Sequence, residues 1–272
     1  MRDARRVDGG PRWLLGQLGL IALGVVVYFG VRGLTDGRPS LAIEHAREVV
    51  AFERRFGLEH EALVQSVVVR HEWLTDVANW VYIWGHWPLI AVVLLWLALR
   101  HRVIYLRLRN AMMISGSAGL VFFASYPVAP PRLSSLGLVD TVTKHSDAYR
   151  VLQPPAFVNQ YAALPSLHVG WDLLVGIAVV TAGGSWWLRW LGRLMPALMA
   201  WAVVATANHY LVDGMLGAVF ALSGLYVAVL LERRREAPAR PSVGHLLPAP
   251  RPAPDDPYPV ARSASCSIER RR

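Results

Sequence analysis

The sequence predicts an all-α polytopic membrane protein, a bundle of six transmembrane helices with an amphipathic helix on its outer side. Apolar residues make up 54% of the chain and charged residues 17%, against about 45–50% and about 25% in soluble domains. Six stretches contain no charged residue, and roughly 20 apolar residues in a helix cross a bilayer core about 30 Å thick. These stretches are 13–31, 77–99, 111–131, 173–188, 194–212 and 214–231. The pattern excludes an ordinary soluble enzyme.

The first elements are a basic arm at residues 1–12 and a span at about 13–31. The apolar stretch of this span is longer than the about 7–15 residues of a signal peptide, so we expect it to stay uncleaved. Segment 36–76 mixes charged and apolar residues at helical spacing, which predicts an amphipathic helix on the membrane surface. This helix either covers a site or lies passively at the interface.

Five further spans are expected before the C-terminal tail. The run 194–231 holds a single charge, Asp213, and is too long for one span, so it must fold back near Asn208. A proline-rich loop at 128–165 separates the third span from the fourth, and loops of this length are usually functional or disordered. The expected spans cover about 78–99, 110–127, 166–184, 187–206 and 209–231.

Residues 13–232 therefore form one membrane domain, and the proline- and arginine-rich tail at 233–272 is expected to be disordered. The net charge of +9 comes from 27 arginines and Lys144, clustered between the spans and at both ends. The arginine clusters fall on one side of a six-span arrangement, which is the cytoplasmic side by the positive-inside rule. Both termini are then cytoplasmic, and the long loop lies outside the cell membrane.

The composition also limits the partners. Once six spans are removed, no folded basic face remains for a nucleic acid, so the arginines are interpreted as topology determinants. The single cysteine, Cys266, allows no intrachain disulfide and argues against a thiolate metal site. The oligomeric state is left open.

Ionisable residues inside spans are costly and are therefore candidates for function. The predicted topology brings His168 and His209 to the same outer depth, beside the long loop. His209 and Asp213 are spaced i, i+4, so they share one face of a helix. An aspartate there accepts the second N–H of the imidazole and prepares the other nitrogen for nucleophilic attack.

Three further residues suit a phosphoryl group. Ser166 follows Pro165 at the expected N-cap of the fourth span, where free backbone N–H groups favour an anion. His168, in the first turn, can donate a proton to a departing oxygen. Arg132, after two prolines, offers a cation for bidentate phosphate contact. Together these residues indicate phosphoryl transfer without a metal or an organic cofactor.

At this point the sequence resembles a known family. Pro165-Ser166-Leu167-His168 resembles the P-S-x-H motif of the type 2 phosphatidic-acid phosphatase superfamily, and 208–213 (NHYLVD) resembles its HxxxD motif. Pro130-Pro131-Arg132 stands where that superfamily has its first basic motif. The combination is closest to the inositol-phosphorylceramide synthase-like, inositolphosphotransferase branch. The resemblance covers about residues 40–232 and implies six spans and a lipid phosphate substrate. It also implies that His209 is the nucleophile, that Asp213 orients it and that His168 is the general acid.

The sequence departs from the phosphatase motifs at several positions. Ser125 stands where the first motif has a lysine, and Ala202-Val203 stands where the last has Ser-Arg. Two phosphate-binding cations are therefore missing from their usual places. Lys144 or Arg150, both in the long loop, are the candidates to replace them.

The sequence also allows three other interpretations. His168 and Asp172 form a second i, i+4 pair, and with His209 and Asp213 they offer two imidazoles and two carboxylates to a divalent metal. In a purely structural interpretation, Asp172 is a polar partner of His168 or Arg132, and His86 is an interfacial histidine without a role in catalysis. The whole set also suits a transporter or channel, although such residues are usually spread through the membrane depth.

Overall fold

The computed structural model describes residues 10–34, 38–134, 136–145 and 160–236, and the residues up to Arg235 form one compact unit. The basic arm up to residue 9, Arg150 and the tail beyond 236 lie outside the described residues. The described residues are mostly helical, with one isolated parallel bridge between Val128 and Ala162. The expected all-α class is confirmed for this part of the chain.

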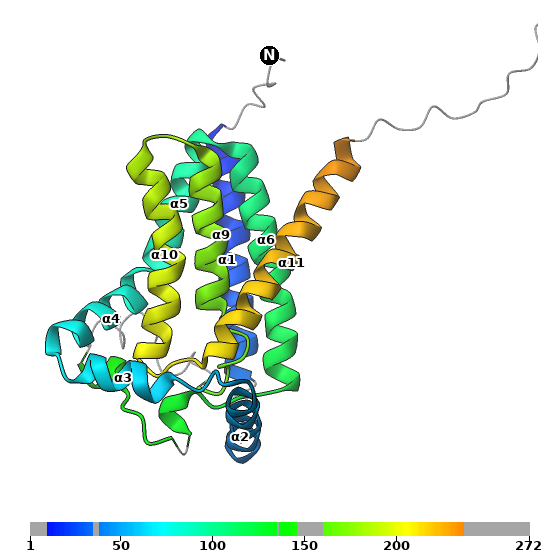
Figure 1. Cartoon of the computed structure of the whole chain (residues 1–272). Coiled ribbons are helices and arrows are strands. Elements are labelled where there is room, and N and C mark those ends of the chain that lie inside the picture. Colours follow the sequence, from blue (N-terminus) through cyan, green and yellow to red (C-terminus); the bar gives the residue numbers. More distant parts are fainter. Residues whose placement is uncertain (1–9, 35–37, 135, 146–159, 237–272) are drawn as a thin grey trace, which may run out of the picture. The chain divides into compact units, whose positions relative to one another are not determined.

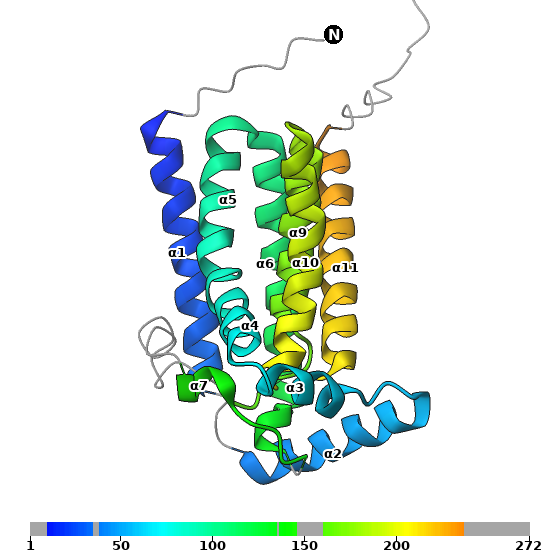
Figure 2. The same ribbon diagram turned by 60° about the vertical axis from the view of Figure 1, so that its left-hand side comes forward.

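Six long helices form the bundle (Figures 1 and 2). They are α1 (Pro11–Leu34), α5 (Trp87–Arg100), α6 (Arg102–Ser125), α9 (Leu167–Ala182), α10 (Trp186–Ala205) and α11 (Leu211–Glu236). By length and apolarity, α1, α10 and α11 are each sufficient to cross a membrane, and α4 (Glu72–Trp84) with α5 forms a bent fourth candidate. The described helices are thus compatible with a membrane protein and supply three or four candidate spans.

The second expected span is broken in the middle. α4 and α5 meet at an angle of 44° at Gly85-His86. Pro88 lies in the first turn of α5, where it supplies no N–H and clashes with a continuing helix. A Cβ at Gly85 would overlap the carbonyl oxygen of Val81, so the turn requires glycine. The break leaves His86 buried between the two helices.

The third expected span, α6, begins about eight residues earlier than the sequence suggests, because its arginines find partners. Arg107 forms an ion pair with Glu232 of α11 at 2.9 Å. Arg109 donates to Gln17 of α1 and to Asn110. The arginine cluster expected in a loop at 100–109 is therefore largely helical.

Helices α2 (Pro39–Phe56) and α3 (Glu61–Val69) lie across the end of the bundle opposite to the beginning of α1 and the end of α11 (Figures 1 and 2). The expected amphipathic segment is thus divided, with Gly57 ending α2 at a φ of 67°. The buried face of α2, including Ala42 and Ala46, packs against Ala129, Leu164 and neighbouring apolar residues. α2 therefore covers this end of the bundle.

Close packing fixes the start of α9 beside α11. A Cβ at Gly217 would overlap the carbonyl oxygen of Ser166, and one at Gly170 would overlap that of Gly217. Small residues of this kind let membrane helices approach closely. The N–H of Ser166 also donates to the carbonyl of Asp213 at 2.9 Å. The two motif segments, 165–168 and 208–213, are therefore neighbours.

Candidate active site

α9 begins as the sequence predicts, with Ser166 as its N-cap. Its hydroxyl accepts from the N–H of Val169 at 3.5 Å, and its side chain is fully buried. His168 is consequently the second residue of the helix, at the end where backbone N–H groups and the helix dipole favour an anion.

The segment before α11 is a tight turn rather than helix. Ala207 has a φ of 55°, and the N–H groups of Asn208 and His209 both donate to the carbonyl of Val203. α11 starts only at Leu211, so His209 and Asp213 do not share a helix face as expected from their spacing. They meet because the Asp213 carboxylate folds back and accepts from the N–H of Tyr210 at 2.9 Å.

The His209 ring is held through Nδ1. Nδ1 donates to the carbonyl of Ala163 at 2.7 Å and lies 3.3 Å from Oδ2 of Asp213. A carbonyl only accepts hydrogen bonds, so Nδ1 carries a proton, and in the neutral ring Nε2 is the nitrogen with the free lone pair. The nearer partner, Ala163, gives no signal in the sequence, because any residue supplies a backbone carbonyl.

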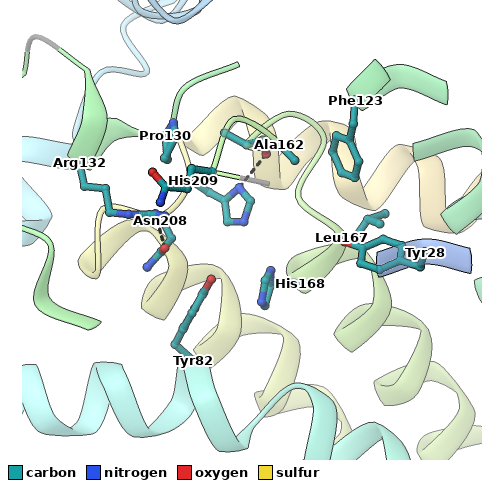
Figure 3. Close-up of a pocket in the computed structure, with 12 residues that line it drawn as sticks. Tyr28, Tyr82, Phe123, Pro130, Arg132, Ala162, Leu167, His168, Asn208 and His209 are labelled. Atoms are coloured by element: carbon teal, nitrogen blue, oxygen red, sulfur yellow. Dashed lines mark hydrogen bonds between the residues drawn. The ribbon is translucent and has the colours of Figure 1, made fainter. Parts of the chain in front are cut away.

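The structure brings the two motif histidines together. The ring centroids of His168 and His209 are 5.5 Å apart. Tyr82 of α4 stacks on His168 at 4.7 Å between centroids, and His86 lies against the same ring at 4.2 Å. Figure 3 shows both imidazoles in one pocket with Tyr82, Arg132 and Asn208. His86 thus belongs to the cluster rather than to an isolated position at the interface.

Asp172 pairs with His86 and not with His168 or Arg132. Nδ1 of His86 lies 2.9 Å from Oδ1 of Asp172, and both side chains are buried. His168 does not pair with Asp172, although the two are spaced i, i+4 on α9. The break at residue 85 turns His86 toward α9, and His86 pairs with Asp172 instead. The pairing could not be read from sequence spacing.

Arg132 lies where the sequence expects a phosphate-binding cation, but it already has partners. Its N–H donates to Ala207, its guanidinium donates to Asn208, and Nε lies 3.3 Å from Oδ2 of Asp140. The arginine side chain is 11% exposed. Asp140 therefore offsets part of the charge that Arg132 brings, and it was not anticipated from the sequence.

A cavity of about 30 Å³ lies among these groups, which is of the order of the space that one water takes up in the liquid. Residues from seven segments of the chain line it, including Tyr28, Arg132, His168 and His209. Lys144 belongs to α7 (Thr141–His145), but its side chain lies outside the described part of the structure.

The structure shows where the residues lie that depart from the phosphatase motifs. The Ser125 hydroxyl donates to the carbonyl of Val121 at 2.9 Å within its own helix. Ala202 and Val203 are buried in α10. Within the described residues, no three His, Cys, Asp or Glu side chains are grouped so that they could hold a metal ion.

Two carboxylates from the covering helices contact the start of α11. Oε1 of Glu53 accepts from the N–H of Val212 at 2.8 Å, and Oε1 of Glu61 accepts from that of Leu211 at 3.0 Å. Both side chains are fully buried. Burial raises the pKa of Glu53 to about 8; the bond from Val212 opposes this shift and the neighbouring Glu61 reinforces it.

Comparison with known proteins gives one match. A family model described as the PAP2 superfamily covers residues 47–227 of the chain. This range contains α4 to α10, both histidines and most of α11. No curated protein and no solved structure matches the chain.

Proposed function

Because the chain belongs to the PAP2 superfamily, we propose that it is an integral membrane enzyme that transfers the phosphoryl group of a phosphorylated lipid. Membership itself indicates phosphatase-type activity on phosphorylated substrates. The observation that carries the proposal is the arrangement of His168 and His209, whose rings are 5.5 Å apart with Nδ1 of His209 hydrogen-bonded.

In the first step, Nε2 of His209 attacks phosphorus while the bond from phosphorus to the leaving oxygen breaks. His168 donates a proton to that oxygen, so the lipid alcohol leaves uncharged. The product is a phosphohistidine. Positive charge on the His209 ring is stabilised by the Ala163 carbonyl and the Asp213 carboxylate, which lie on its other nitrogen.

In the second step, His168 takes a proton from water or an alcohol, and the resulting oxygen attacks phosphorus. The P–N bond breaks, and His209 returns to its starting state. Water as acceptor gives a phosphatase. With a phosphodiester donor the headgroup stays on phosphorus in the intermediate, and an alcohol acceptor then gives headgroup transfer of the inositolphosphotransferase type. The proposed mechanism needs no metal and no organic cofactor, because the guanidinium of Arg132 and the N–H groups at the start of α9 bind the phosphoryl oxygens.

We place six spans in the membrane: α1, α4 with α5, α6, α9, α10 and α11. We add α6 to the four candidates because its Arg107 is paired with Glu232, and α9 because it is apolar apart from His168 and Asp172. The arginine distribution puts residues 1–12 and 233–272 in the cytoplasm and the site on the outer side of the cell membrane. Residues 13–232 are then the membrane domain.

Phosphate release from a panel of lipid phosphates by the purified protein tests this function. His209→Gln should reduce turnover by about 10³-fold or more and leave lipid binding unchanged. His71→Gln is the matched control, because His71 is exposed and lies outside the cluster. Full turnover by His209→Gln would contradict the mechanism. Loss of ion or lipid flux without any phosphate release would favour a transporter.

A further inference from the structure

A second, larger cavity lies within the bundle between α1 on one side and α5 and α6 on the other. Its volume of about 430 Å³ falls within the about 300–1,000 Å³ that is typical of small-molecule sites. Its lining is almost entirely aliphatic or aromatic and includes Leu20, Gly24, Ile90, Met112 and Leu120. Figure 2 shows α1 beside α5 along this length.

Aromatic residues of α1 pack against the bundle on either side of this cavity. At one end, Trp13 packs against Tyr105 with centroids 5.7 Å apart. At the other end, Tyr28 packs against Trp87 at 6.4 Å and Trp171 at 6.1 Å. Between these contacts α1 carries Gly24, where an added Cβ would meet no atom within 4 Å.

The cavity adjoins the candidate active site. Tyr28 lines both cavities, and Trp171 follows His168 by three residues on α9. From Leu20 to Tyr28 the cavity extends about 12 Å at about 1.5 Å per residue. Its inner end contains Arg109, whose guanidinium is bound to Gln17 and Asn110 and so forms a polar floor.

The lining is also open toward the surroundings of the helix bundle. Leu23 and Val27 line the cavity from α1, and both are exposed. In the proposed membrane arrangement, the medium around these residues is lipid hydrocarbon. An acyl chain can therefore enter sideways, between α1 and α5, without crossing a polar region.

We infer that this cavity, which we call the α1 groove, binds one hydrocarbon chain of the lipid whose phosphate reaches His209. The inference rests on the proposed function and specifies the substrate class as a long-chain lipid. The apolar lining excludes a headgroup, and the shared Tyr28 links the groove to the reacting phosphate. The polar floor at Arg109 limits the depth that the chain reaches.

The test uses Gly24→Trp, which fills the groove from α1. Gly19→Trp is the matched control: nothing lies within 4 Å of its Cβ either, and it is about 140° around the helix from Gly24 at 3.6 residues per turn. Each purified variant is assayed for phosphate release from long-chain phosphatidic acid and from a water-soluble short-chain analogue.

Gly24→Trp should lower kcat/KM for the long-chain lipid about tenfold, as expected when about two methylene groups lose an apolar site. It should leave the short-chain analogue unchanged, and Gly19→Trp should change neither. An equal effect on both substrates, or no effect on the long-chain lipid, would overturn the inference.

A measurement that needs no turnover separates this inference from the proposed function. Phosphatidic acid with a photoreactive group at the end of one acyl chain is bound to the wild-type protein and irradiated. The inference expects label on α1 and α6 near Gly24 and Met112, and Gly24→Trp should remove it. Label only elsewhere overturns the groove, whether or not the protein releases phosphate.

Discussion

His86 and Asp172 form a buried hydrogen-bonded pair directly behind the candidate acid His168. Nδ1 of His86 is 2.9 Å from Oδ1 of Asp172, and the His86 ring lies 4.2 Å from that of His168. The two side chains are 3% and 0% exposed. Oδ2 of Asp172 accepts no hydrogen bond from any described residue, and Oδ1 bonds to His86. The pair thus fixes the His86 ring that lies against His168.

The first prediction is that Asp172→Asn lowers kcat about tenfold, an effect of about 1.4 kcal/mol, with little change in KM. The amide accepts a weaker hydrogen bond than the carboxylate, so the His86 ring is held less firmly and proton transfer by the neighbouring His168 is less well aligned. The pH profile of kcat should shift, whereas a purely structural role would change only thermal stability. Asp76→Asn, at an exposed position on α4, is the control. A wild-type profile for Asp172→Asn would refute the positioning role.

A second prediction concerns stability against pH. The pKa of Glu53 is about 8 in the folded protein, against a model-compound value of 4.5. The folded state therefore binds a proton that the unfolded state releases between these values, so the free energy of unfolding falls as pH rises from about 4.5 to 8.

Glu53→Gln should remove this dependence, because the amide oxygen still accepts from Val212 and carries no charge. The variant should unfold at a higher temperature than the wild type at pH 8 and at a similar temperature at pH 5. Glu44→Gln, exposed on the same helix, should keep the wild-type slope. An unchanged slope in Glu53→Gln would show that Glu53 is ionised when folded.

The local sequence predicts the positions of helices in this chain where contacts with distant residues do not intervene. Charge-free stretches coincide with long helices because a bilayer-length helix tolerates few unpaired charges. The rule failed at 100–109, because Arg107 finds Glu232, which is 125 residues away. It also failed at Gly85, where a close approach to the Val81 carbonyl and the nearby Pro88 break a single expected span.

The site was predicted only as far as its motifs reach. The sequence predicts that His168 and His209 lie together because each is near the start of an expected span and both starts lie at the same end of the bundle. The partners of the site residues come from elsewhere: the Ala163 carbonyl for His209, His86 for His168 and Asp140 for Arg132. A backbone acceptor and contacts between residues far apart in the chain leave no periodic signal in the sequence. The spacing therefore predicted the wrong histidine partner for Asp172.

The third prediction tests sidedness. Arg55 is exposed near the end of α2, on the side that we propose to be outside. In a Cys266→Ala background, Arg55→Cys should react with an impermeant maleimide in intact cells. Cys266 of the wild-type chain is the internal control and should react only after lysis. The reverse pattern would place the candidate site in the cytoplasm.

The fourth prediction is that chelation leaves activity nearly unchanged. The proposed steps use two imidazoles, the Arg132 guanidinium and backbone N–H groups, and Asp172 is already engaged with His86. Phosphate release should therefore be the same with and without EDTA. Activity lost to EDTA and restored by a divalent ion would instead support a metal held by the two histidine and aspartate pairs.

The last prediction concerns the acceptor. A phosphate monoester is a dianion near neutral pH, whereas a phosphodiester carries one negative charge. Around the cavity, Arg132 is already 3.3 Å from Asp140, and the motif positions at Ser125 and Ala202 supply no cation. Fewer positive charges suit the diester, so the protein should transfer a phosphorylated headgroup and incorporate labelled inositol into lipid.

Asp140→Asn tests the charge argument directly. Removing the carboxylate leaves more of the Arg132 charge available to the substrate, so the ratio of monoester hydrolysis to headgroup transfer should rise. Glu59→Gln, which removes a carboxylate from an ion pair with Arg54 on the covering helices, should leave that ratio unchanged. Steady phosphate release from a monoester by the wild type, with no labelled lipid formed, would reject transfer and identify a lipid phosphate phosphatase.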